Sequence, residues 1–283
     1  MEVVTKIAPI ILALIMLGLG LGLKLEDFGR VLKTPKDFIV GFISQIIILP
    51  IVALILILIL KTPPEIAIGV MIIAAAPGGV TSNIMTKFAD GDVALSISLT
   101  AVISLFSIIT VPLIIFTSAD FLGITEISQN ISMIGIALKM FLVVTVPVIL
   151  GMIIRKFAEN FIASRSEIFN KLNMVLFIIF FIAAFYEERE NFINFFKQAG
   201  LIALVLNITM MVIAFYLAKY FASGIAQRKA ISLECGLQNG ALAIFVATQI
   251  FGADILYTTP AAAYALIMYI TSFIFVFLLK NKN

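Results

Sequence analysis

One acidic residue stands out because it lies well inside an apolar stretch. Glu234 opens the segment Glu-Cys-Gly-Leu-Gln-Asn-Gly, residues 234–240. An ionisable group at membrane depth costs about 3 kcal/mol or more unless it is paired or solvated. Gln238 and Asn239 lie one turn away, and the Asn-Gly turn frees backbone carbonyls. This pattern predicts an oxygen-rich cation site; the alternative is a protonated carboxyl bonded to a neighbouring helix.

A second polar cluster follows the segment Ala-Pro-Gly-Gly at residues 76–79 and consists of Thr81, Ser82 and Asn83. Pro and paired Gly disfavour an uninterrupted helix, so a new helix is expected to start after Gly79. Ser and Thr commonly cap such a start, which is the alternative interpretation for Thr81 and Ser82. The helix start also presents a positive dipole end that suits an anion.

Hydroxyl groups recur along one face of a third stretch. Ser96, Thr100, Ser104 and Ser107 are spaced by four, four and three residues, which aligns them on a helix. Such hydroxyls often bond back to their own helix or allow close packing, and this reading applies above all to Ser104 and Ser107. Ser96 and Thr100 are candidate ligands. Gln45 is either an interhelical hydrogen-bonding residue or a ligand.

The composition excludes several function classes. Of 283 residues, 62% are hydrophobic and 12% charged, against about 45–50% and about 25% in soluble domains. A dispersed net charge of +3 predicts no nucleic-acid partner. With no His and a single Cys, zinc chemistry, His-based catalysis and a disulfide framework are not expected.

Nine stretches are long and apolar enough to cross a bilayer, which requires about 20 residues per helix. The first is interpreted as a membrane helix and not as a cleaved signal. The whole chain, 1–283, is interpreted as one integral membrane domain. The nine expected spans are 5–23, 38–60, 65–88, 93–117, 131–154, 168–186, 199–221, 227–250 and 255–279.

The positions of Lys and Arg predict the orientation. With nine spans, fourteen of the nineteen basic residues fall on one side, four fall on the other, and Lys139 lies inside the fifth span. The prediction is therefore a multi-pass protein of the cell membrane with its N-terminus outside and its C-terminus in the cytoplasm.

Two spans are expected to be broken. The third carries residues 76–79 near its middle and the eighth carries residues 234–240. On the predicted topology they run in opposite directions, as broken helices do in inverted-repeat transporters, where ligands bind near the crossing. The predicted fold is an all-α polytopic membrane protein with an inverted repeat of four plus five helices and two discontinuous helices crossing at the midplane.

The two motifs resemble the bile acid:sodium symporter family. The resemblance rests on APGGVTSNIMTKFADGDVALS, residues 76–96, and on ECGLQNGALA, residues 234–243, with GLGLKLEDF at 20–28 as weaker support. It implies a panel domain formed mostly by residues 1–60 and 131–186, and a core domain formed by 65–117 and 227–279. Bacterial relatives have five helices in the first repeat, whereas four are expected here.

The resemblance also implies two bound sodium ions and their ligands. Carboxylate, amide, hydroxyl and carbonyl oxygens are the ligands that hard cations select. The first ion would be held by Ser82, Asn83, Ser96, Thr100 and Glu234, and the second by Gln45, Glu234, Gln238 and the carbonyls of Cys235 and Leu237. Substrate contacts are expected from Thr81, Asn239 and Tyr269, the last replacing an Asn of a bacterial relative.

These features predict a sodium-coupled symporter of a small organic anion, such as a bile acid, pantoate or a keto acid, working by alternating access. Proton coupling through the lone carboxylate is one alternative. Metalloid efflux is another, because Cys235 lies at the break. An intramembrane enzyme is not expected, since no partner carboxylate, His or nucleophile accompanies Glu234. The sequence leaves the oligomeric state open.

Overall fold

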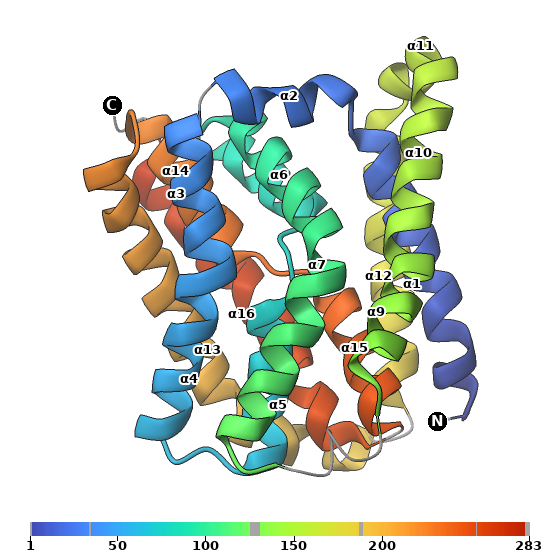
Figure 1. Cartoon of the computed structure of the whole chain (residues 1–283), viewed down its shortest axis with the longest axis vertical. Coiled ribbons are helices and arrows are strands. Elements are labelled where there is room, and N and C mark those ends of the chain that lie inside the picture. The colour runs from blue at the N-terminus through green and yellow to red at the C-terminus, as the bar shows by residue number, and fades with distance from the viewer. Residues whose placement is uncertain (1, 34, 125–130, 187–188, 253, 281–283) are drawn as a thin grey trace.

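The computed structural model of this chain describes residues 2–33, 35–124, 131–186, 189–252 and 254–280. These parts are helical and contain no strand, only an isolated bridge between Gly78 and Gln238 (Figure 1). The all-helical fold class is therefore confirmed. The helices are α1 (Glu2–Gly22), α2 (Leu25–Lys33), α3 (Pro35–Ile43), η1 (Ser44–Ile48), α4 (Leu49–Ile59), α5 (Pro64–Ala75), α6 (Val80–Phe88), α7 (Val93–Phe121), α9 (Met133–Met140), η2 (Phe141–Thr145), α10 (Val146–Phe157), α11 (Glu159–Ser164), α12 (Ser166–Tyr186), α13 (Arg189–Phe221), α14 (Ile225–Gly236), α15 (Gly240–Phe251) and α16 (Ile255–Leu279).

Within the described ranges, five helical segments are long and apolar enough to cross a membrane. They are Pro35–Ile59, Val93–Phe121, Met133–Phe157, Phe196–Phe221 and Ile255–Leu279. Three shorter apolar helices are Ile7–Gly22, Pro64–Ala75 and Gly240–Phe251. The last two are halves of the two spans expected to be broken, which is why neither reaches full length. The chain is a multi-pass membrane protein, and the count of nine spans stays a prediction.

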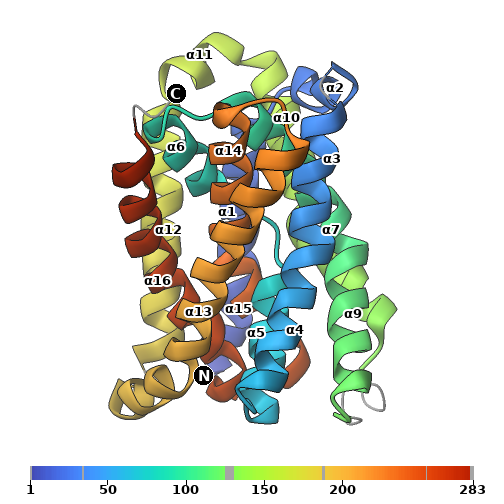
Figure 2. The same ribbon diagram turned by 90° about the vertical axis from the view of Figure 1, so that its left-hand side faces the viewer.

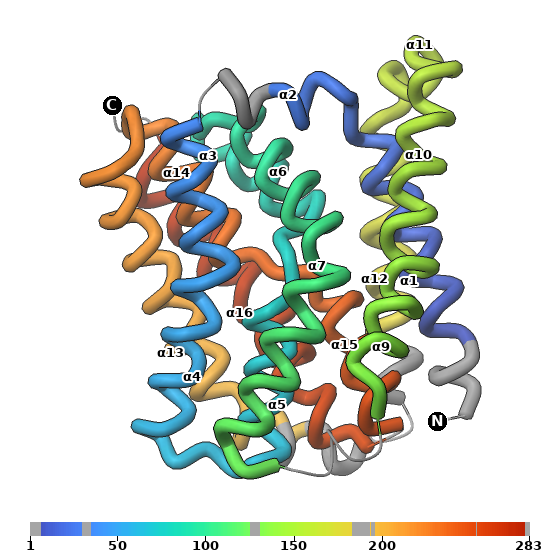
Figure 3. The backbone as a smooth tube through the Cα atoms, viewed as in Figure 1, coloured from blue at the N-terminus to red at the C-terminus, as the bar shows by residue number. Residues whose placement is uncertain are grey.

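The helices form two groups that stand side by side in Figure 1, and in the turned view of Figure 2 helices α1 and α10 of the smaller group lie behind the larger group. In the smaller group α1 packs against both α10 and α12. In the larger group α13 packs on α14 and α16, and α5 packs on α7 and α16. The short amphipathic helix α2 runs across one end of the molecule between the groups (Figure 3). Its first turn is held by Asp27, whose carboxylate accepts a 2.7 Å hydrogen bond from the Lys24 amide.

A proline widens the helix that runs from Pro35 to Ile59. Pro50 has no N–H, and its ring crowds the carbonyl four residues earlier, so a regular α-helix is disfavoured there. A π-helical turn at Ser44–Ile48 directly precedes it and accommodates this crowding. Gln45 lies in this turn and is buried, so the local irregularity determines where its side chain is presented.

The smaller group depends on a close approach of two backbones. A Cβ atom added at Gly20 of α1 would collide with the carbonyl group of Val148, and one added at Gly151 of α10 would collide with that of Leu17. Small residues at such positions let membrane helices pack closely. The glycines therefore fix the distance between α1 and α10.

We predict that Gly20→Ala destabilises the protein by about 1–3 kcal/mol, the usual cost of overpacking against an unyielding neighbour. Gly22→Ala is the matched control, because nothing lies within 4 Å of a Cβ atom at Gly22. The measurement is thermal unfolding of both variants in detergent micelles. Equal melting temperatures for the two variants would contradict the proposed close contact.

Candidate functional site

The two helix breaks meet in the middle of the molecule. The Asn239 amide donates a 2.8 Å hydrogen bond to the carbonyl of Pro77, and Gly78 pairs with Gln238 in an antiparallel bridge. An unpaired backbone group in a membrane interior costs several kcal/mol. Each break therefore provides hydrogen-bond partners for the other, and this mutual pairing holds the ends of α5, α6, α14 and α15 together.

Glu234 lies at the centre of an oxygen cluster and is fully buried. Its Oε2 atom accepts hydrogen bonds from Ser82 Oγ at 2.7 Å and Ser96 Oγ at 2.9 Å. Its Oε1 atom accepts one from Thr100 Oγ1 at 2.5 Å. Asn83 Oδ1 lies 2.8 Å from Ser96 Oγ and 3.4 Å from Thr100 Oγ1. The five residues predicted for the first sodium ion thus come together from α6, α7 and α14.

The cluster holds more close oxygen pairs than hydroxyl protons. Besides these contacts, Ser82 Oγ lies 2.7 Å from the carbonyl oxygen of Gly79 and 3.4 Å from Thr100 Oγ1. Each Ser or Thr hydroxyl carries a single proton, so Ser82, Ser96 and Thr100 cannot donate in all of these contacts at once. A cation satisfies such a set of converging oxygens, because every oxygen then acts as an acceptor.

No side chain caps the start of α6. Its N-cap is Gly79, without a side-chain hydrogen bond. The capping interpretation of Ser82 is therefore wrong, since its hydroxyl turns toward Glu234 and the Gly79 carbonyl. Of the other hydroxyls on α7, Ser107 does bond back to its own helix, with Oγ 2.7 Å from the Ser104 carbonyl. Ser104 Oγ is buried with no hydrogen-bond partner in the structure.

Gln45 and Gln238 form a second polar contact, one helical turn from Glu234. Gln45 Nε2 donates to Gln238 Oε1 at 2.6 Å and to the carbonyl of Ala76 at 3.1 Å. Gln238 Nε2 donates to the carbonyl of Cys235 at 2.8 Å. The structure therefore joins three of the groups predicted for the second ion. Gln45 Oε1 is buried and has no hydrogen-bond partner, so it remains available as an acceptor.

Asn207 was not among the predicted site residues. This buried residue of α13 donates through Nδ2 to the Gly236 carbonyl at 2.7 Å and accepts from Thr271 Oγ1 at 2.6 Å. Gln45 contacts the Ala76 carbonyl in the same way, so one amide supports the end of the helix before each break. An isolated Asn inside an apolar stretch was the available sequence signal.

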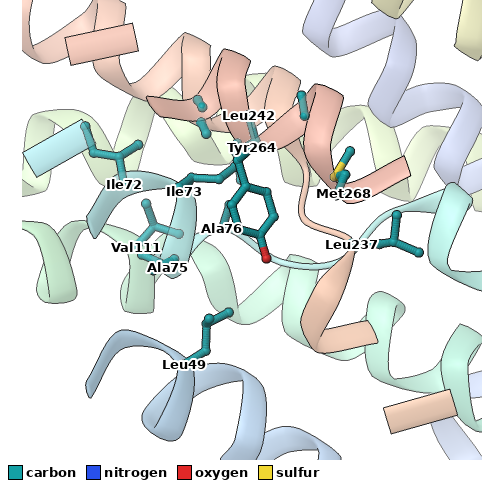
Figure 4. Close-up of a cluster of buried hydrophobic side chains, with 14 of the residues drawn as sticks. Leu49, Ile72, Ile73, Ala75, Ala76, Val111, Leu237, Leu242, Tyr264 and Met268 are labelled. Atoms are coloured by element: carbon teal, nitrogen blue, oxygen red, sulfur yellow. The ribbon is translucent and has the colours of Figure 1, made fainter. Parts of the chain in front are cut away.

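Buried apolar side chains pack against the two helix breaks. Figure 4 shows the Tyr264 ring among them, with Ala76 of one break and Leu237 of the other on either side. Tyr264 is fully buried, and Leu237 and Ala76 are 0% and 1% exposed. Because interiors are close-packed, this cluster restricts movement of the polypeptide at the crossing.

A pocket of about 190 Å³ opens beside the crossing, between α1 and α12 on one side and α6, α15 and α16 on the other. Thr81, Asn239 and Tyr269, the residues predicted to contact substrate, all line it. The Asn239 side chain also accepts a 3.0 Å hydrogen bond from the Leu242 amide and so caps α15. Both α6 and α15 start at this pocket, which places two positive helix ends there.

One charged residue of the pocket was not predicted. Lys171 of α12 lines it together with Asn170 and Asn173. From the sequence, Lys171 entered only the distribution of basic residues between the spans. The signal for a polar lining was the polar start of this helix, whose first two turns include Asn170, Lys171 and Asn173 and precede an apolar stretch.

The buried carboxylate, the crossing of broken helices and the adjacent pocket define a membrane transporter. Residues 9–195 match the profile of the sodium bile acid symporter family. The chain belongs to this family, and its membership implies sodium as the coupling ion. The matching segment includes the first break but ends before the second.

Individual relatives agree with this assignment. "Uncharacterized sodium-dependent transporter YocS" of Bacillus subtilis is 30% identical over 93% of this chain and 79% of its own length. "Probable sodium/metabolite cotransporter BASS1, chloroplastic" of Arabidopsis thaliana is 29% identical over 85% of this chain and 59% of its own length. "Ileal sodium/bile acid cotransporter" of Cricetulus griseus is 34% identical over 40% of this chain and 33% of its own length. The chain thus spans less than two thirds of the plant and animal relatives named here. These relatives are transporters and not enzymes, as expected for this chain.

We predict that Gly78→Ala disrupts the oxygen cluster, because a Cβ atom there would collide with the Glu234 carboxylate. Gly79→Ala is the matched control, since its nearest neighbour is Thr81 Oγ1 at 3.9 Å. Sodium at 100 times its Kd should stabilise the wild-type protein by about 2.7 kcal/mol. The sodium-dependent rise in melting temperature should persist in Gly79→Ala and be lost in Gly78→Ala. A full sodium response in both variants would contradict this prediction.

Proposed function

We propose that this protein couples the entry of two sodium ions to the uptake of a small organic anion by alternating access. The first ion binds to Ser82, Asn83, Ser96, Thr100 and Glu234. The second binds to Gln45, Glu234, Gln238 and the carbonyls of Cys235 and Leu237. The family assignment supports sodium coupling. The number of ions, their ligands and the substrate are proposed here in addition.

The observation that carries this proposal is the oxygen cluster around Glu234. The carboxylate is 0% exposed and receives three hydroxyl contacts, yet no Lys or Arg forms an ion pair with it among the described residues. A buried carboxylate without a cationic side chain is costly. A bound sodium ion supplies the missing positive charge and coordinates the surrounding oxygens.

The pocket beside the crossing is the proposed substrate site. Its volume of about 190 Å³ is below the range of about 300–1,000 Å³ for drug-sized ligands. We therefore propose a carboxylate of a few carbons, of the pantoate or keto acid type, rather than a steroid. The helix ends of α6 and α15 and the Lys171 ammonium favour its negative charge.

In this proposed mechanism the chain consists of two parts, a panel and a core, that move against each other. The panel consists of α1, α10 and α12 with their short connections, and the core contains the crossing. Residues 35–59 were expected to belong to the panel, but they pack on α5, α7, α13 and α14. We therefore propose that the boundary falls between α2 and α3 and that α3 and α4 move with the core.

We predict that Thr100→Val lowers sodium affinity about tenfold or more, because a hydrogen bond to a charged group is worth about 1.5–3 kcal/mol and 1.4 kcal/mol corresponds to a factor of ten. Ser98→Ala is the control on the same helix, since Ser98 Oγ bonds back to the carbonyl of Ala94, at 2.8 Å. A sodium titration followed by thermal shift measures both affinities. Unchanged affinity in Thr100→Val would contradict the assignment of Thr100 as a ligand of the ion.

Coupling to protons is the competing function, because the three hydroxyls around Glu234 also suit a protonated carboxyl. A thermal-shift screen of pyruvate, pantoate and taurocholate with sodium first identifies a transported anion. In proteoliposomes we predict that an inward sodium gradient at equal pH drives its accumulation and that Glu234→Gln abolishes it. Accumulation driven by a pH gradient in sodium-free buffer would establish proton coupling instead.

A further inference from the structure

A second and larger cavity lies away from the crossing, at the end of the molecule that carries α2 and α11 (Figure 1). Its volume is about 590 Å³. It is lined by Leu23 and Lys24 between α1 and α2, by α2, by α10, by the first residue of α11 and by Leu105 of α7, so both helix groups contribute to it. The Lys and Arg distribution predicts that this end faces the cytoplasm.

The cavity combines an apolar wall with a basic rim. Ile149 and Ile153 of α10 form part of the wall and are 43% and 46% exposed, which is typical of side chains that face lipid. Arg155 and Lys156 occupy the last turn of the same helix. Lys24, at the start of α2, adds a third cation to the rim.

Two of these cations, Arg155 and Lys156, form no ion pair among the described residues. Lys24 pairs with Glu159 at 2.5 Å, and this contact lowers the pKa of the Glu159 carboxyl below its usual value. Arg155 donates through Nη1 to the Leu21 carbonyl at 2.7 Å, while its Nε is buried without a partner. No ion pair within the described chain involves Lys156. With Glu26 also at the rim, the cavity retains one net positive charge.

We infer that this cavity binds an anionic glycerophospholipid. The phosphate contacts Arg155 and Lys156, and an acyl chain lies along Ile149, Ile153 and Leu105. Basic pockets between membrane helices on the cytoplasmic side suit anionic headgroups, and that leaflet is rich in them. The open apolar wall favours a lipid over a free phosphate ion, because it supplies the contact area that an acyl chain requires.

A lipid in this position touches α10 on one side and Leu105 of α7 on the other. It therefore bridges the two helix groups at one end of the molecule and stabilises the arrangement in which they lie this close. This site is independent of the ions and the substrate assigned above.

Native mass spectrometry of the purified protein tests the inference with phosphatidylglycerol and phosphatidylcholine of identical acyl chains. Phosphatidylglycerol should be retained more strongly, and Lys156→Gln should weaken its binding about fivefold, the effect of about 1 kcal/mol per basic residue near a charged membrane surface. Lys280→Gln is the matched control, because Lys280 is an exposed cation at the end of α16 and does not line the cavity. Equal binding by both variants, or equal retention of both lipids, would overturn the inference.

A second variant tests the apolar wall without changing charge. Leu105→Trp should fill part of the cavity and displace the acyl chain, so phosphatidylglycerol retention should fall while the melting temperature in lipid-free detergent is maintained. Inorganic phosphate should not compete with the lipid. Competition by millimolar phosphate would show that the cavity binds a free anion. Unchanged retention in Leu105→Trp would show that the acyl chain does not lie in the cavity. Either result would overturn the lipid assignment.

Discussion

The structure depends on keeping one carboxylate charged in an apolar interior. Glu234 is fully buried, and its described partners are neutral oxygen groups. Hydroxyl donors lower the cost of burying the charge but do not balance it. The site is therefore stable either with a cation or with a proton on the carboxylate. The bare carboxylate is unfavourable without either of them. This difference suits a transporter, because the protein then prefers different conformations with and without its ion.

The crossing also provides hydrogen-bond partners for the backbone groups that the two helix breaks leave unpaired inside the membrane. Breaking a helix frees carbonyl and amide groups, and these must find partners within the protein. Asn239 and Pro77 pair across the two breaks, and Asn207 and Gln45 each contact a carbonyl that precedes a break. Gly78 is needed for a different reason, since only a residue without a side chain leaves room for Glu234.

The sequence allowed prediction of the breaks but not of all contacts around them. Pro, paired Gly and Asn-Gly are local signals, so the break after Ala75 and the break after Gly236 were both expected. Residue types and spacing pointed to oxygen ligands, and the family resemblance divided them between two sodium ions. Asn207 was missed because its role depends on packing between α13 and α14, which no local pattern specifies. The π-helical turn that presents Gln45 was missed for a related reason, since Pro50 predicts a disturbance without giving its form.

Charge balance links the proposed ion sites to the proposed substrate. One carboxylate with two sodium ions leaves a net charge of +1 beside two helix ends that are themselves positive. Such an excess is unfavourable in a medium of low dielectric constant, so the second ion is held more tightly once an anion is present. By thermodynamic reciprocity the anion also binds more tightly once both ions are present. A monoanion restores neutrality, whereas a neutral analogue of the same shape does not, and coupling would then follow from electrostatics without a direct contact between ion and substrate.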